Sequence, residues 1–219
     1  MGKMTVEQIL MQLLGGVGIT LQIFVVTLVF SLPLGLLVAS WRMSRNRALS
    51  TLMKVYISVM RGTPLMLQLM VVYFGPYYLF GLSFGKSYRL YATFIGFVLN
   101  YAAYFAEIYR SGIQSMPQGQ YEAAKLLGYS RRQTFFLIIM PQVMKRILPS
   151  VTNEVITLVK DTSLAFTLSV MEMFSIAKAM AAAQTTMVPF IAAGLFYYVF
   201  NLLVAVFMEW VEKRLGYYQ

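Results

Sequence analysis

The sequence contains neither cysteine nor histidine. Without cysteine, the chain can form no disulfide and offers no thiol nucleophile or thiolate metal ligand. Without histidine, it lacks the commonest general base and the commonest metal ligand. The sequence also has no GxxxxGK[ST] phosphate-binding loop. We therefore expect a chain that is not an enzyme and that holds no metal or cofactor of its own.

Charge is also scarce, since charged residues make up 12% of the 219 residues and hydrophobic residues 59%. Soluble domains carry about 25% charged residues, so this chain has too little polar surface to coat a soluble globule. The net charge of +10 could suggest nucleic acid as a partner. However, the Lys and Arg residues flank apolar runs, as cytoplasmic anchors do, so we expect a lipid bilayer and no nucleic acid. We expect no cleavable signal peptide.

Apolar runs of about 20 residues, long enough to cross a bilayer as a helix, recur along the chain. They predict an all-α integral membrane protein with five transmembrane helices in one domain, 16–215, preceded by an external segment, 1–15. The predicted spans are 19–40, 58–82, 90–108, 147–170 and 187–208. The positive-inside rule places the loop 111–145 and the C-terminus in the cytoplasm and the N-terminus outside, in a cell (plasma or inner) membrane.

The cytoplasmic loop is built from two short helices. Strong helix formers at 121–127 are followed by Gly128, which suits a helix C-cap. Ser130 and Gln133 fit a capping box that opens a second helix, which we expect to end before Pro141. This loop is either a connector that lies on the membrane surface or a docking element for a cytoplasmic partner.

Fixed spacings in this loop carry a family resemblance. Glu122-Ala123-Ala124, then Gly128 after three residues and a segment ending in Pro141 after nine more, resembles the EAA signature of permease subunits of binding-protein-dependent ABC importers. Met140 stands where the family pattern has leucine. The segments RGTPL at 61–65, AYFAEIYRSGI at 103–113, GQYEAA at 119–124 and KDTSL at 160–164 resemble the polar amino acid branch of that family. The likeness covers about 16–215.

The resemblance implies the type I ABC importer permease fold, with a coupling-helix loop. It also implies a second permease copy, identical or paralogous, an ABC ATPase dimer, and an extracellular solute-binding protein that delivers a polar amino acid. ATP and Mg would be bound by the partner ATPase. The stretch 162–180 resembles members that carry cystine, although the sequence does not otherwise name the amino acid. The residues implied to couple to the ATPase are Tyr121, Glu122, Ala123, Ala124, Leu127 and Gly128.

Several polar side chains fall inside the predicted spans, where they are costly unless they face protein or water. At about 100° per residue, Glu154 and Asp161 share one helix face, with Lys160 beside them. These residues either line a translocation pathway or form a structural network in which Lys160 neutralises a carboxylate. The pathway candidates are Gln68, Asn100, Glu154, Thr157, Asp161 and Thr162. The candidates for a structural or gating role are Arg61, Glu107, Arg110 and Lys160, with an expected Glu107–Arg110 pair.

The alternative function is an autonomous ion-coupled secondary carrier that uses Glu154, Lys160 and Asp161 as a relay. Such carriers usually show internal repeats and more spans, and no repeat is evident here. We also expect the stretch 171–184, which includes Glu172 and Lys178, to form an external amphipathic segment. It would either contact the binding protein or cover the helix bundle.

Overall fold

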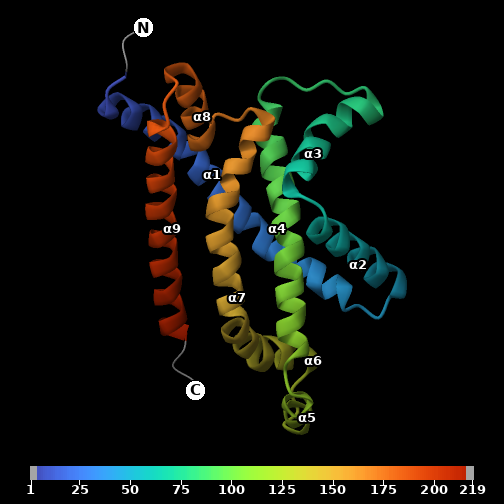
Figure 1. The fold of residues 1–219 in the computed structure, drawn as a ribbon. Coiled ribbons are helices and arrows are strands. Elements are labelled where there is room, and N and C mark those ends of the chain that lie inside the picture. The colour runs from blue at the N-terminus through green and yellow to red at the C-terminus, as the bar shows by residue number, and fades with distance from the viewer. Residues whose placement is uncertain (1–3, 216–219) are drawn as a thin grey trace.

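The computed structural model describes residues 4–215, and all regular elements in that part of the chain are helical. The long helices are α1 (Val6–Arg42), α4 (Tyr88–Gln114), α7 (Met140–Asp161) and α9 (Val188–Leu215). In Figure 1, α4 and α7 stand side by side at the centre, α1 crosses them obliquely, and α9 lies along the side of α7 away from α4. The buried core lies mainly between α1, α4 and α7.

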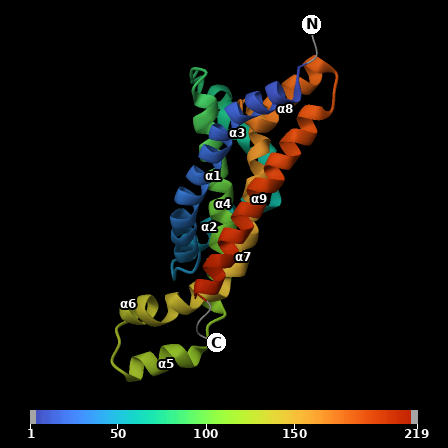
Figure 2. The same ribbon diagram turned by 90° about the vertical axis from the view of Figure 1, so that its left-hand side faces the viewer.

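The shorter elements lie at the two ends and on one side of this bundle. α8 lies at the end where α1 begins, and α5 and α6 lie at the opposite end, where α9 finishes (Figures 1 and 2). The shorter elements are α2 (Arg47–Gly62), α3 (Leu65–Phe80), α5 (Gln118–Leu126), α6 (Arg131–Gln133), the π-helix η1 (Thr134–Ile139), the 3-10 helix η2 (Thr162–Leu168) and α8 (Met173–Gln184).

Three helical stretches within residues 4–215 are long and apolar enough to cross a membrane: Val6–Arg42, Arg131–Leu168 and Val188–Arg214. The bent pair α2–α3 makes a fourth if it counts as one span. The predicted span 90–108 corresponds to α4, which is not among them, so the number of five spans stays a prediction. α1 begins inside the predicted external segment 1–15, of which residues 1–3 lie outside the described residues.

The predicted span 58–82 is not one continuous helix. α2 ends at Gly62, α3 begins at Leu65, and the two helices are bent by 113° relative to each other. Thr63 is extended, with φ −123° and ψ 150°, because the residue before a proline is sterically disfavoured in the α region. Pro64 also has no N–H with which to continue a helix. The uncharged run that predicted one span therefore contains its own helix break.

The second loop helix does not end before Pro141, contrary to expectation. Its capping box at Ser130 and Gln133 is present, but the chain continues through the π-helix η1 directly into α7. Pro141 lies in the first turn of α7, where a missing N–H is tolerated. α7 therefore begins before the predicted span 147–170 and ends at Asp161, and η2 follows over Thr162–Leu168.

Small residues of α1 allow its closest approaches to other helices. A Cβ atom at Gly35 would lie 2.8 Å from the Cβ of Phe105 on α4. A Cβ atom at Gly16 would lie 2.7 Å from the backbone N and Cα of Met173, at the start of α8. One turn further along α1, the buried Thr20 hydroxyl accepts a hydrogen bond of 3.3 Å from the Met173 N–H. α1 therefore fixes the positions of both α4 and α8.

The stretch 171–184, predicted to be an external amphipathic segment, contains α8. Glu172, the N-cap of α8, is however fully buried. The Glu172 carboxylate accepts hydrogen bonds from the N–H groups of Phe174 (2.7 Å) and Ser175 (2.6 Å) and from the Ser175 hydroxyl (2.9 Å). The Tyr197 hydroxyl of α9 donates a further bond of 3.0 Å. Burial raises the pKa of the Glu172 carboxyl, and these four donors act in the opposite direction. The carboxylate thus joins α8 to α9.

Both ends of α8 are marked by unusual backbone. Ser169, with φ 55°, precedes the helix, and Thr185, with φ 49°, follows it. In the described part of the chain, they are the only residues other than glycine with a positive φ. A β-branched residue such as Thr185 rarely adopts this left-handed conformation.

Candidate functional site

α5 lies beyond the end of the helix bundle, next to η1 (Figure 2). Its C-terminal end is closed at Gly128, which has φ 80°. The Gly128 N–H donates to the Lys125 carbonyl (3.1 Å), and the Tyr129 N–H donates to the Ala124 carbonyl (3.0 Å). This is the Schellman arrangement, in which glycine meets the need for a positive φ. The predicted cap at Gly128 is therefore confirmed.

Most of the predicted coupling residues lie on the open surface of α5. Ala124 alone among the six is buried, whereas the side chain of Leu127 is 75% exposed. Partial burial raises the pKa of the Tyr121 hydroxyl. Leu126 is 88% exposed and was not among the predicted residues, although its place in the same apolar run could have indicated it. α5 thus presents two exposed leucines beside an ordered cap.

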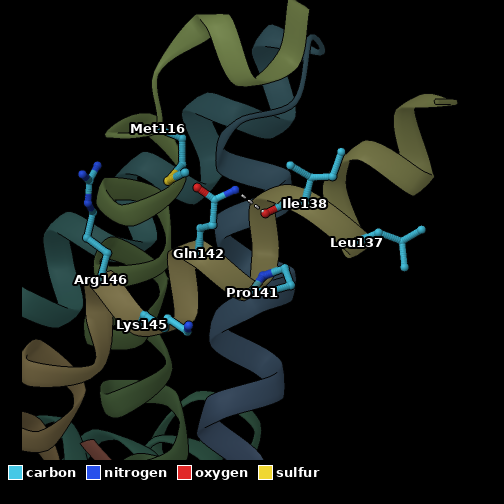
Figure 3. Close-up of a pocket in the computed structure, with 7 residues that line it drawn as sticks. All are labelled: Met116, Leu137, Ile138, Pro141, Gln142, Lys145 and Arg146. Carbon is cyan, nitrogen blue, oxygen red and sulfur yellow. Dashed lines mark hydrogen bonds between the residues drawn. The ribbon is translucent and has the colours of Figure 1, made fainter. Parts of the chain in front are cut away.

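A cavity of about 770 Å³ opens where the loop joins the bundle. Figure 3 shows its lining, which comes from the end of α4, from η1 and from the first turns of α7. The Gln142 amide donates to the Ile138 carbonyl at 2.8 Å, and the Arg146 guanidinium donates to the Ser115 carbonyl at 2.6 Å. These two bonds connect α7 to the π-helical turn and to the end of α4. The lining residues are Met116, Leu137, Ile138, Pro141, Gln142, Lys145 and Arg146.

Two predicted pathway residues, Gln68 and Asn100, meet at the bend between α2 and α3. The Gln68 amide nitrogen donates to the carbonyls of Met60 (2.9 Å) and Thr63 (3.1 Å), and the Asn100 amide donates to the Met60 carbonyl (3.1 Å). Asn100 also donates to the Gln68 side-chain oxygen at 2.9 Å. Carbonyls at the end of a helix lack intrahelical partners, so these two amides supply the partners that α2 loses at the bend.

A second cavity, of about 440 Å³, lies between α2, α4 and α7. Glu107 and Arg110 form the predicted ion pair on its wall, with a second bond from Arg110 Nε at 3.0 Å. The Arg61 guanidinium lies 5.3 Å above the centre of the Tyr104 ring, a cation–π arrangement. Glu154 enters the cavity from α7. The charged side chains of the lining are Arg61, Glu107, Arg110, Arg146 and Glu154.

Asp161, predicted to share a pathway face with Glu154, does not line this cavity. Instead, it accepts a hydrogen bond of 2.7 Å from the hydroxyl of Tyr101, a buried residue of α4. Sequence reasoning missed Tyr101 because the pairing of a residue on one helix with a residue on another leaves no local spacing signal. Lys160 is exposed and forms no ion pair with any described residue. The role of Lys160 in a structural network therefore stays a prediction, without a direct ion pair among the described residues.

The remaining pathway candidates are hydrogen-bonded within their own helix. The Thr157 hydroxyl donates to the Asn153 carbonyl (2.9 Å), and the buried Thr162 hydroxyl donates to the Val159 carbonyl (2.7 Å). Of the six candidates, Glu154 alone has no hydrogen-bond partner among the described residues. Across residues 4–215, no group of three or more acidic side chains could hold a metal ion.

The family of binding-protein-dependent transport system inner membrane components matches residues 31–217. The chain belongs to this family. This permease is thus the membrane component of a transport system and not an enzyme, and its all-helical fold is that of type I ABC importer permeases.

Individual relatives match this permease over most of their length. A putative glutamine transport system permease protein of Rickettsia bellii is 35% identical over 201 residues, which is 91% of each chain. An L-cystine transport system permease protein of Bacillus subtilis is 35% identical over 207 residues, covering 93% of this chain and 86% of the relative. The solved structure of an amino acid ABC transporter with histidines has a TM-score of 0.83 and 29% identity, covering 93% and 94% of the two chains.

Proposed function

We propose that this permease carries a polar amino acid into the cell with energy from ATP hydrolysed by a partner ATPase dimer. An extracellular binding protein would deliver the amino acid, and a second permease, identical or paralogous, would complete the pathway. The N-terminus would lie outside and the C-terminus in the cytoplasm. Family membership carries this proposal, and relatives named for glutamine and L-cystine transport support amino acids as the solute class.

The coupling step is proposed for α5. Its exposed Leu126 and Leu127 offer apolar surface that a groove of the ATPase would bury, and the Gly128 cap holds them in place. The chain runs without a break from α6 through η1 into α7, which carries Glu154. A displacement of α5 by the ATPase would therefore be passed along α7 to the second cavity.

For the pathway itself, the structure supports some candidates more than others. Glu154 lines the second cavity and has no hydrogen-bond partner in the described chain, which supports contact with the solute. The Asp161 carboxylate accepts a hydrogen bond from Tyr101 and the Thr162 hydroxyl donates to the Val159 carbonyl, and both residues stay pathway candidates. Gln68 and Asn100 are engaged at the α2–α3 bend, and their bonds support a structural role.

The first test is to purify this permease in mild detergent from its native membrane and to identify the proteins that accompany it. We expect an ATPase with P-loop motifs and an extracellular binding protein. The complete assembly is then placed in proteoliposomes, and uptake of labelled L-glutamine and L-cystine is measured with and without ATP. Uptake that requires both ATP and the binding protein would support the proposal. A permease that purifies alone and transports without ATP would instead be an autonomous ion-coupled carrier.

The Gly128→Val variant makes the coupling role testable. A β-branched residue at φ 80° is strained, so the cap should open, the ATPase should dissociate and ATP-driven uptake should be lost. Gly119→Ala is the matched control, because Gly119 belongs to the same helix and has no heavy atom within 4 Å of an added Cβ. If Gly128→Val retains both the ATPase and the uptake, α5 is a connector and not the coupling helix.

A further inference from the structure

Some of the charged side chains that line the second cavity have no ion-pair partner among the described residues. Of the five charged side chains in its lining, Glu107 and Arg110 are paired with each other through two bonds. Arg146 is already hydrogen-bonded, because its guanidinium donates to both the carbonyl (2.6 Å) and the hydroxyl (3.0 Å) of Ser115. Arg61 and Glu154 remain, one cation and one anion.

These two residues are not bonded to one another or to any other charged residue in the described chain. The ring of Tyr104 supports the Arg61 guanidinium from one side and leaves its N–H groups available, since a ring face is not a hydrogen-bond acceptor for all five of them. Glu154 is half-buried, and its oxygens have no donor.

The two charged side chains come from different helices. Arg61 belongs to the last turn of α2, directly before the bend that the Gln68 and Asn100 amides hold. Glu154 belongs to α7 and lines the same cavity. Both side chains therefore line one cavity without forming an ion pair with each other.

We propose that Arg61 and Glu154 together bind the zwitterionic part of an α-amino acid. Arg61 would hold the α-carboxylate, which matches the planar fork of its guanidinium, and Glu154 would hold the α-ammonium. This assignment rests on the proposed function and deepens it. A simple anion would meet Glu154 and a simple cation would meet Arg61, whereas a zwitterion satisfies both. The cavity of about 440 Å³ lies within the range of roughly 300–1,000 Å³ of small-molecule sites.

The assignment has a consequence for specificity. Both contacts are to groups that every α-amino acid carries, so the permease would recognise the common part of the solute. Selection among side chains would then fall mainly to the extracellular binding protein.

The test measures binding to the detergent-purified complex of permease and ATPase, without the binding protein. The probes are labelled L-glutamine, L-glutaminamide, which lacks the α-carboxylate, and glutaramic acid, which lacks the α-ammonium. The wild-type complex should bind L-glutamine about ten- to a hundredfold more tightly than either analogue, because each analogue loses one charged hydrogen-bonding group. Arg61→Gln should weaken L-glutamine binding by a similar factor and leave L-glutaminamide binding unchanged. Glu154→Gln should weaken L-glutamine binding and leave glutaramic acid binding unchanged.

Arg47→Gln is the matched control, since it removes an exposed cation from α2, the helix that carries Arg61, at a position that lines neither cavity, and it should leave L-glutamine affinity unchanged. Thermal unfolding of each variant checks that the complex is intact, and Arg61→Lys provides a conservative substitute. The proposal is overturned if Arg61→Gln weakens L-glutamine and L-glutaminamide equally, or if the wild-type complex does not distinguish the three probes. Either result leaves the proposed function standing as long as ATP-driven uptake is observed with the binding protein present.

Discussion

Gly16 is the residue at which α1 comes closest to α8. A Cβ atom there would lie 2.7 Å from two backbone atoms of Met173, and backbone cannot rotate out of the way as a side chain can. We expect Gly16→Ala to lower the free energy of unfolding by about 1–3 kcal/mol, as overpacking of a tight contact does. Thermal unfolding of the detergent-purified protein, followed by tryptophan fluorescence, measures the change.

The neighbouring Gly15 is the control for that substitution. It lies on the same helix and has no heavy atom within 4 Å of an added Cβ. Gly15→Ala should therefore leave the unfolding temperature unchanged or raise it slightly, because alanine is the better helix former. Equal effects at the two positions would show that the close approach of α1 and α8 is not the reason why Gly16→Ala destabilises the protein.

Glu172 provides a second test at the scale of one residue. Its carboxylate satisfies two backbone N–H groups, a serine hydroxyl and the Tyr197 hydroxyl in a buried place. Glu172→Ala leaves these donors without an acceptor, and we expect a loss of about 2–4 kcal/mol of stability. Tyr197→Phe removes only one donor and should cost about 1 kcal/mol. Glu209→Ala, on the exposed end of α9, should leave stability unchanged. This control shows that the destabilisation by Glu172→Ala comes from its buried hydrogen bonds and not from the loss of a negative charge alone.

At the scale of elements, the bend between α2 and α3 depends on two amide side chains. Gln68 and Asn100 each bind carbonyls at the end of α2 and also bind each other. We expect Gln68→Leu and Asn100→Leu each to lower stability by about 1–3 kcal/mol, because Gln68→Leu leaves the Thr63 carbonyl without its donor and Asn100→Leu leaves the Gln68 side-chain oxygen without its donor. The double variant should cost clearly less than the sum, since the two residues act as one unit.

Unfolding of the two single variants and the double variant in a mutant cycle measures this coupling. Strict additivity would contradict a shared role at the bend. Uptake measured on the same variants then addresses the pathway role predicted for these residues. A loss of uptake greater than the loss of intact protein would support that role in addition to the structural one.

The elements differ in how far their sequences determine them. The Gly128 cap, the Ser130 capping box and the Glu107–Arg110 pair were predictable because all their partners lie within a few residues on one helix. The bend at Pro64 has a local signal, which is the proline itself, but the long uncharged run around it predicts one span. Hydropathy reports how apolar a segment is and not whether it is straight.

At the scale of the whole molecule, the fold class was predictable because composition and repeated apolar runs require a helical membrane protein. The contacts between helices were not. Gln68 with Asn100, Tyr101 with Asp161 and Glu172 with Tyr197 join residues that are far apart in the sequence. Their pairing is determined by how the helices cross, which one sequence does not encode in any local pattern.

The predicted orientation in the membrane is directly testable because the chain contains no cysteine. Single cysteines are placed at the exposed positions Lys125 on α5 and Ala182 on α8, which lie at opposite ends of the molecule. A maleimide that cannot cross membranes should label the Ala182→Cys variant in intact cells and the Lys125→Cys variant only after permeabilisation. The reverse pattern would place α5 outside and contradict both the orientation and the coupling role.

The backbone at the two ends of α8 affects how firmly that helix is held. Ser169 and Thr185 both adopt left-handed conformations, which cost residues other than glycine about 1–2 kcal/mol each. The contacts at Gly16, Thr20 and Glu172 hold α8 in place and offset the backbone strain at Ser169 and Thr185. If α8 detached, Ser169 and Thr185 could relax out of their left-handed conformations. The free energy needed to detach α8 is therefore lower than the loss of its buried contacts alone implies.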